Sequence, residues 1–207
     1  MSSVALAEFI ASINASPLAP WAALAPWEVT SQAEAIVRRL ITGLSFAAFT
    51  ASGEVLVHKS AVVECGALLK GPLILGSKCF VAAGAYLRGG NWVGEGCTFG
   101  PGAELKSSFV FAGTKLAHFN FVGDSIVGRD VNFEAGSIVC NYRNERQDKE
   151  ILVRLAGALQ RTGHQKFGAV VGDHSRIGAN SVVAPGALVR PGSVVARASL
   201  CDDELAQ

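Results

Sequence analysis

Four polar side chains, widely spaced along the chain, could together transfer an acyl group to the amine of a molecule that also carries a phosphate. His118 could accept a proton from the attacking amine, since the ordinary pKa of histidine is about 6.5. Arg88 and Lys106 could contact a phosphate through charge-assisted hydrogen bonds. Asn141, or backbone N–H groups, could donate to the oxyanion of the tetrahedral intermediate. This chemistry needs no metal if the acyl donor is a thioester.

A six-residue repeat must position these side chains. Stepping by six through residues 57–117, 121–139 and 171–195 gives 20 positions, of which all except Ala117 are Val, Ile, Leu or Phe. Small residues usually follow four positions later. A period of six fits neither an α-helix nor a long two-residue alternation, so it predicts short strands joined by tight corners. In the β-helix proteins that this pattern resembles, three such units close one triangular coil, and neighbouring coils would lie about 4.8 Å apart, the ordinary strand spacing.

The repeat assigns the polar residues to particular faces, named A, B and C in order from Val57. Side chains alternate across a strand, so Arg88 and Lys106 should stack on the outside of face C in adjacent coils. Asn141 should lie at the end of that face, roughly 14 Å from Arg88 by strand spacing. His118 should mark the corner leading onto face C.

The register is expected to slip by two residues beside His118, with Phe111, Ala117 and Phe121 as inward anchors on either side. Such irregularities cluster at functional sites, which favours a functional role for His118. The simpler interpretations are a structural histidine, solvated surface charges at Arg88 and Lys106, and a turn residue at Asn141.

The chain outside the repeat predicts three further parts. Residues 1–50 should form an α-helical N-terminal cap over the first coil, with a short helix at 6–13 and a second helix opened by a Ser31/Glu34 capping box. The β-helix domain should cover residues 51–200, followed by a C-terminal tail at 201–207. Its polar interruption at 143–170 reads as a functional loop.

Composition limits the possible partners and location. The net charge is +1, and the sequence contains no apolar run long enough to span a bilayer, so neither nucleic acid nor a membrane is an expected partner. The five cysteines are odd in number and form no CxxC pair. The simplest interpretation is a cytoplasmic protein with reduced thiols.

Three segments carry a resemblance to known families. Residues 115–124 and 130–142 resemble the acetyltransferase domain of the bifunctional N-acetylglucosamine-1-phosphate uridylyltransferase/glucosamine-1-phosphate acetyltransferases. Residues 153–189 resemble the C-terminal domain of archaeal sugar-1-phosphate nucleotidylyltransferases. The resemblance implies an all-β fold, a left-handed parallel β-helix of hexapeptide repeats, assembled as a homotrimer with the 143–170 loop reaching across the interface. It also implies acetyl-CoA as co-substrate, an amino-sugar phosphate as acceptor and no metal.

The resemblance also implies a role for each candidate residue. His118 matches the catalytic base, and Asn141 a catalytic residue near the amino group and acyl donor. The matches to substrate-binding residues are Arg88, Lys106, Phe121, Asn132, Tyr142 and Lys149, and Ala179 falls where the family binds the cofactor CoA. Phe121 stands where both relatives carry tyrosine, and Gln147 where the family has a lysine. These departures leave open the sugar, the acyl group and whether the acceptor carries a nucleotide.

Two other functions remain as alternatives, and two more are disfavoured by the sequence. An O-acyltransferase would use the same histidine without needing the two cations, and a non-catalytic scaffold would explain Phe121 and Gln147. A γ-class carbonic anhydrase needs three zinc-binding histidines at a spacing that the four histidines of this chain lack. A nucleotidylyltransferase needs a separate domain with a glycine-rich loop, which residues 1–50 do not contain.

Overall fold

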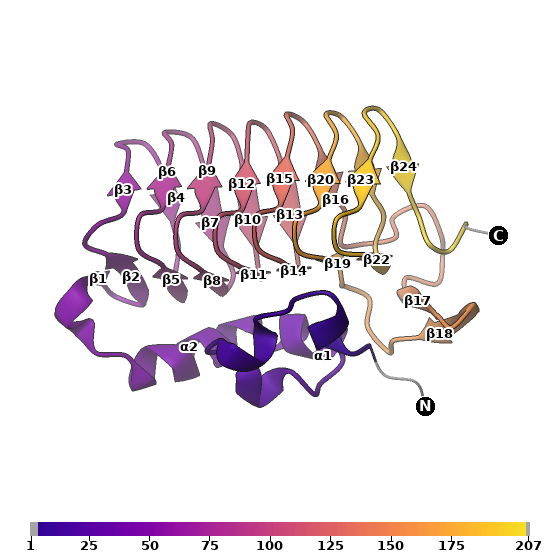
Figure 1. The fold of residues 1–207 in the computed structure, drawn as a ribbon, viewed down its shortest axis with the longest axis horizontal. Helices are drawn as coiled ribbons and strands as arrows, with labels where there is room; N and C mark the ends of the chain where they lie inside the picture. The colour runs from indigo at the N-terminus through magenta and orange to yellow at the C-terminus, as the bar shows by residue number, and fades with distance from the viewer. Residues whose placement is uncertain (1–3, 206–207) are drawn as a thin grey trace.

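The computed structural model describes residues 4–205, which form a parallel β-solenoid with three faces (Figure 1). Val63 pairs with Val81 and Leu69 with Leu87, so each coil is 18 residues long at this end of the solenoid. The all-β prediction is confirmed, and the arrangement is consistent with the predicted left-handed β-helix.

Each coil contributes one short strand to each face. Face A contains β2 (Val55–His58), β5 (Leu73–Leu75), β8 (Asn91–Val93), β11 (Phe109–Val110), β14 (Ile126–Val127), β19 (Ala169–Val171) and β22 (Ala187–Val189). Face B contains β3 (Val62–Val63), β6 (Phe80–Val81), β9 (Thr98–Phe99), β12 (Lys115–Leu116), β15 (Asn132–Phe133), β20 (Arg176–Ile177) and β23 (Val194–Val195). Face C contains β4 (Leu68–Leu69), β7 (Tyr86–Arg88), β10 (Glu104–Lys106), β13 (Phe121–Gly123), β16 (Ile138–Val139), β21 (Val182–Val183) and β24 (Leu200–Cys201).

The predicted anchors form the buried interior except around residues 105–127. There the inward side chains are Val110, Leu116 and Val122, so the prediction of Phe111, Ala117 and Phe121 is wrong. The chain makes five-residue steps from Leu105 to Val110 and from Val122 to Val127. The slip therefore lies at the corner between faces C and A, where Ser107 and Asp124 have positive φ values, and not beside His118.

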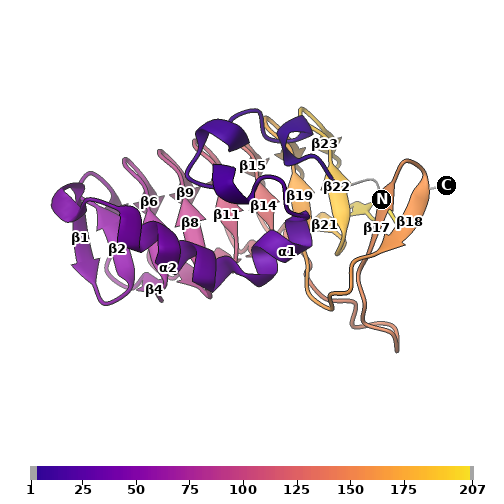
Figure 2. The ribbon, with the colours of Figure 1, turned by 90° about the horizontal axis from the view of Figure 1, so that it is seen from below.

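The N-terminal segment lies along face A instead of over the first coil (Figure 2). The reason is an apolar column on the outside of this face, which would otherwise contact water. The column consists of Ile74, Trp92, Phe109, Ile126, Val170 and Leu188. The covering elements are 3-10 helices at Leu6–Glu8, Ile13–Ala15 and Ala19–Trp21, and the α-helices α1 (Pro26–Ser31) and α2 (Ala33–Gly43). A further 3-10 helix, Phe46–Ala48, is exposed. The edge of the first coil is instead met by β1 (Phe49–Ser52), antiparallel to β2.

Two local predictions in this segment are wrong. The predicted helix at 6–13 is divided into two 3-10 helices. Ser31 ends α1 instead of capping the next helix, and α2 begins after Gln32 without a side-chain capping bond. The carboxylate that does cap a helix is Glu28, which accepts a hydrogen bond from the Ala25 N–H at 2.9 Å.

The polar interruption contains the antiparallel hairpin β17 (Leu152–Leu155) and β18 (Ala158–Arg161). Ile151, Val153 and Phe167 are fully buried in the cluster between face A and the N-terminal segment. The centre of the Phe167 ring lies 5.9 Å from that of Trp27. Much of the interruption therefore packs on its own chain.

Replacing Val93 with Asp should strongly destabilise the solenoid. Val93 is 1% exposed and belongs to the interior cluster, so the carboxylate would be buried without a partner, which costs several kcal/mol. Thermal unfolding would measure the effect, with the outward-facing Thr98→Asp as control. A soluble Val93→Asp variant with an unchanged midpoint would contradict this register.

Candidate functional site

Arg88 and Lys106 lie in one outward column of face C, as predicted. The backbone register pairs these residues in adjacent coils. Each cation contacts a carboxylate: Arg88 Nη2 lies 2.7 Å from Glu104 Oε1, and Lys106 Nζ lies 2.8 Å from Asp124 Oδ2. The Arg88 guanidinium also lies over the Tyr86 ring, 5.5 Å from its centre. Two positioned cations thus stand where the strands of face C end.

Asp124 connects Lys106 to Asn141. Its side chain is 8% exposed and accepts hydrogen bonds from Lys106 Nζ, at 2.8 and 3.1 Å, and from Asn141 Nδ2. Its backbone N–H donates to the Lys106 carbonyl. Asp124 had no predicted role. The sequence feature that could have indicated its role is its position directly after a strand of face C, at the same corner as Ser107.

Phe121 packs beside Asn141 across a glycine. A Cβ atom on Gly123 would lie 2.7 Å from Phe121 Cζ and 2.8 Å from Asn141 Nδ2. A side chain at position 123 would displace both groups, so the glycine lets Phe121 and Asn141 share this space. The phenyl group stands next to the polar cluster, so the absent hydroxyl changes the chemistry of this site directly.

His118 lies at the corner between faces B and C and is exposed. Its carbonyl accepts a hydrogen bond from the Gly136 N–H, and the buried Asn120 side chain donates to the Glu134 carbonyl of the next coil at 2.8 Å. A Cβ on Gly100 would lie 3.3 Å from His118 Nδ1, so the ring leans over the preceding coil. The corner holds the imidazole at the start of β13 and leaves it accessible.

Tyr142 and Lys149 lie in the segment after Asn141. Lys149 Nζ is 5.4 Å from the centre of the Tyr142 ring and donates to the Asn144 carbonyl at 2.8 Å. Gln147, between them in sequence, is exposed. The predicted substrate-binding loop therefore begins where the cluster of Lys106, Asp124 and Asn141 ends.

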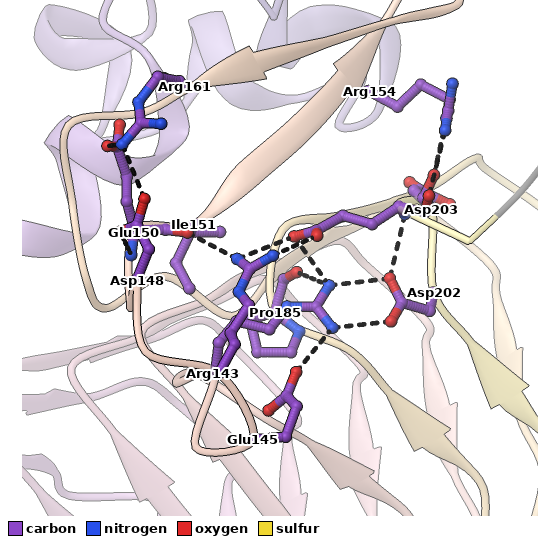
Figure 3. A network of polar contacts seen from close by, with 12 residues as sticks. Arg143, Glu145, Asp148, Glu150, Ile151, Arg154, Arg161, Pro185, Asp202 and Asp203 are labelled. Carbon is purple, nitrogen blue, oxygen red and sulfur yellow. Dashed lines mark hydrogen bonds and ion pairs between the residues drawn. The ribbon is translucent and has the colours of Figure 1, made fainter.

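The C-terminal residues hold this loop in place (Figure 3). The Arg143 guanidinium, whose side chain is 7% exposed, donates to both carboxylate oxygens of Asp202, at 2.7 and 2.8 Å, and to the Pro185 carbonyl. Glu204 contacts Arg143 at 3.0 Å and Arg146 at 2.6 Å. Hydrogen bonding to Arg143 lowers the pKa of Asp202 below its ordinary value. The sequence alone predicts no role for these acidic residues.

Asn132 and Ala179 belong to a different surface. Asn132 lies on face B, between Lys115 and Arg176, and lines a groove of about 410 Å³ together with Glu134 and other residues of the last coils. The Ala179 N–H donates to Glu134 Oε2 at 2.9 Å. Arg197 and this N–H lower the pKa of Glu134 to about 2. The predicted residues therefore form two groups, on faces B and C, with His118 at the corner between them.

Within residues 4–205 no helix is long and apolar enough to cross a membrane. The same described residues contain no group of three or more His, Cys, Asp or Glu side chains that could hold a metal ion.

Comparisons with known proteins identify homologues. No family model matches the chain. It is 33% identical over 185 residues to the bifunctional protein GlmU of Methanococcus maripaludis (strain C7), covering 88% of this chain and 44% of that protein. It is 40% identical over 83 residues to a bifunctional sugar-1-phosphate nucleotidylyltransferase/acetyltransferase of Sulfurisphaera tokodaii, covering 40% of this chain and 20% of that protein.

A solved structure also aligns with the solenoid. It is a point mutant of AntD, an N-acyltransferase from Bacillus cereus, in complex with dTDP and coenzyme A. The identity is 13%, the TM-score is 0.31, and the alignment covers 74% of this chain and 79% of that one. The sequence matches show that this β-solenoid chain is homologous to GlmU-type bifunctional proteins. The chain spans less than half the length of these curated relatives.

Proposed function

We propose that this protein is an acetyl-CoA-dependent N-acetyltransferase acting on an amino-sugar phosphate, with His118 as general base. The observation that carries the proposal is the cluster of Lys106, Asp124 and Asn141 beside Arg88, on the face that begins at the His118 corner. Homology to proteins named as GlmU and as a bifunctional sugar-1-phosphate nucleotidylyltransferase/acetyltransferase supports the same reaction class. The protein is proposed to act in the cytoplasm.

The reaction needs one proton acceptor and one oxyanion donor. The acceptor amine attacks the thioester carbonyl while His118 takes its proton. Asn141, or a backbone N–H, donates to the oxyanion of the tetrahedral intermediate. The intermediate collapses, the C–S bond breaks, and the imidazolium returns the proton to the leaving thiolate.

In this proposal residues 1–50 serve as a helical cover, residues 51–200 as the acyltransferase domain and residues 201–207 as a tail.

The groove on face B is suited to the cofactor. Arg176 and Arg197 line it together with the exposed apolar side chain of Val194. Coenzyme A carries phosphates and a long, uncharged arm, and both need such a combination of cations and apolar surface. Asn132 and Ala179 would then lie near the donor, and Arg88, Lys106, Tyr142 and Lys149 near the acceptor.

Replacing Arg88 with Ala should raise the KM for the phosphorylated acceptor roughly tenfold or more, with a smaller change in kcat, because a charged contact to phosphate is lost. Lys70 is a matched control. It lies one coil earlier at the same end of face C, with its Nζ 5.3 Å from the centre of the same Tyr86 ring. Steady-state kinetics of both alanine variants should separate them, and equal KM values would contradict the role of Arg88.

We expect a homotrimer, because the two groups of site residues lie on different faces and a neighbouring chain would close the site around His118. The exposed residues of the 143–170 loop, among them those of the hairpin strand β18, are available to contact that neighbour. Light scattering at micromolar concentration should give three times the chain mass, 21.5 kDa. A monomeric mass would contradict the assembly.

The proposed function is tested by following free thiol release from acetyl-CoA with a panel of sugars. Amino-sugar phosphates should support release, whereas their N-acetylated forms and amino sugars without phosphate should not. Release with sugar phosphates that lack an amine would favour an O-acyltransferase. If none supports release and calorimetry detects no acetyl-CoA binding, the protein is a non-catalytic scaffold.

A further inference from the structure

A cavity of about 700 Å³ adjoins the proposed acceptor site at the corner between faces C and A. Its floor consists of Gly89, Ser107 and Asp124, which directly follow β7, β10 and β13. One wall is residues 30–35 and Arg38, at the start of α2, and the other is residues 164–166, which return from the hairpin. The cavity thus lies between the solenoid, its helical cover and the loop.

The cavity is continuous with the phosphate end of the acceptor site. Gly89 follows Arg88, Ser107 follows Lys106, and Asp124 is the carboxylate that Lys106 contacts. His118 lies at the opposite end of the strands of face C, about 10 Å away by the rise of a three-residue strand. An acceptor with its amine near His118 and its phosphate near the two cations would therefore point its remaining substituent into the cavity.

The lining suits a further phosphate attached to a polar group. The first turn of the eleven-residue helix α2 lines the cavity, and its N-cap residue, Gln32, makes no side-chain capping bond. A Cβ atom on Gly90 would lie 2.6 Å from the Glu34 nitrogen, so this turn abuts the solenoid, and the positive end of its dipole favours an anion beside it. Lys166, which is exposed, adds a cation to the lining. Two carboxylates also face the cavity, each beside a cation: Glu34 contacts Arg38 at 3.1 Å, and Asp124 contacts Lys106.

The volume is also too large for a phosphate alone. Small-molecule sites usually occupy about 300–1,000 Å³. Carboxylates such as that of Glu34 can accept hydrogen bonds from ribose hydroxyls, as acidic residues do in dinucleotide sites. We infer that this cavity holds the nucleoside phosphate of the acceptor, which is therefore a nucleoside diphosphate-linked amino sugar. This inference rests on the proposed function, since it extends the same acceptor site.

The first test compares two acceptors that differ only in the nucleotide. The kcat/KM should be higher for the nucleoside diphosphate-linked amino sugar than for the matching amino-sugar 1-phosphate. Ala35→Trp should fill the cavity and lower the kcat/KM of the nucleotide-linked acceptor about tenfold, leaving that of the 1-phosphate nearly unchanged. The exposed Thr42→Trp, on the same helix outside the cavity, is the matched control. A wild type that prefers the 1-phosphate, or a Trp effect equal for both acceptors, would overturn the inference.

The second test does not need turnover. Calorimetry with UDP, dTDP, CDP and GDP should detect binding of at least one, weakened by Ala35→Trp and, should that variant not fold, by Lys166→Ala. The absence of binding by all four would overturn the inference even if the 1-phosphate is acetylated. Binding that Ala35→Trp weakens, in a protein that acetylates neither acceptor, would support the cavity assignment while the proposed function fails.

Discussion

His118→Ala should reduce kcat by roughly 10²–10⁴-fold while leaving the fold and the affinity for acetyl-CoA nearly unchanged. The side chain is exposed at a corner whose geometry is set by Asn120 and by backbone bonds, so its removal leaves these contacts in place. Without the imidazole no positioned group takes the proton of the attacking amine. Steady-state kinetics with calorimetry for acetyl-CoA would measure both effects.

His174 provides the control for this prediction. It is also exposed, and it lies on the turn before β20, beside Asp130. His174→Ala should keep turnover within about twofold of the wild type, as expected for a surface change away from the reacting groups. A His118→Ala enzyme with full turnover would make this histidine structural and leave the reaction without its base.

Arg143→Ala should lower the free energy of unfolding by about 3–5 kcal/mol, the cost of removing one partner from a buried ion pair. Asp202 and Glu204, whose side chains are 7% and 12% exposed, would lose their contacts with the guanidinium. Arg143 lies two residues after Asn141, so turnover should fall as well. Chemical denaturation would measure the stability. Arg190→Ala is the control, because the Arg190–Glu8 pair is exposed and such pairs contribute about 0–1 kcal/mol.

The same network predicts an acid dependence of stability. The pKa of Asp202 is lowered in the folded protein, chiefly by its hydrogen bonds with Arg143. Its contribution is therefore complete above the unfolded value, near 3.9, and disappears as the pH falls through the lower folded value. Asp202→Asn should be less stable than the wild type at neutral pH, and the difference should shrink under acid. Equal stability of the two proteins at neutral pH would contradict this role.

The repeat predicts the solenoid and the stacking of Arg88 on Lys106, because a strict period fixes which residues share a face. It fails where neighbouring residues are both apolar. Val110 precedes Phe111, and Val122 follows Phe121, so either member of each pair could be the inward anchor by type alone. Only the five-residue steps at the corner between faces C and A decide between them.

Contacts made by residues outside the six-residue repeat cannot be predicted from its period. Arg143 and Asp202 are 59 residues apart and are joined only after the interruption folds back on the solenoid. The position of the N-terminal segment likewise depends on the apolar column on the outside of face A. That column could have been recognised from Ile74, Trp92 and Phe109, which recur just before the inward positions.

The most direct test of the central claim is the position of the transferred acetyl group. The protein should be incubated with ¹³C-acetyl-CoA and a phosphorylated amino sugar, with and without a linked nucleotide, and the product characterised by NMR and mass spectrometry. The label should appear as an amide on the sugar nitrogen, and His118→Ala should form this product far more slowly. An ester on a sugar hydroxyl, or no labelled product with any phosphorylated amino sugar, would contradict the proposed N-acetyltransferase.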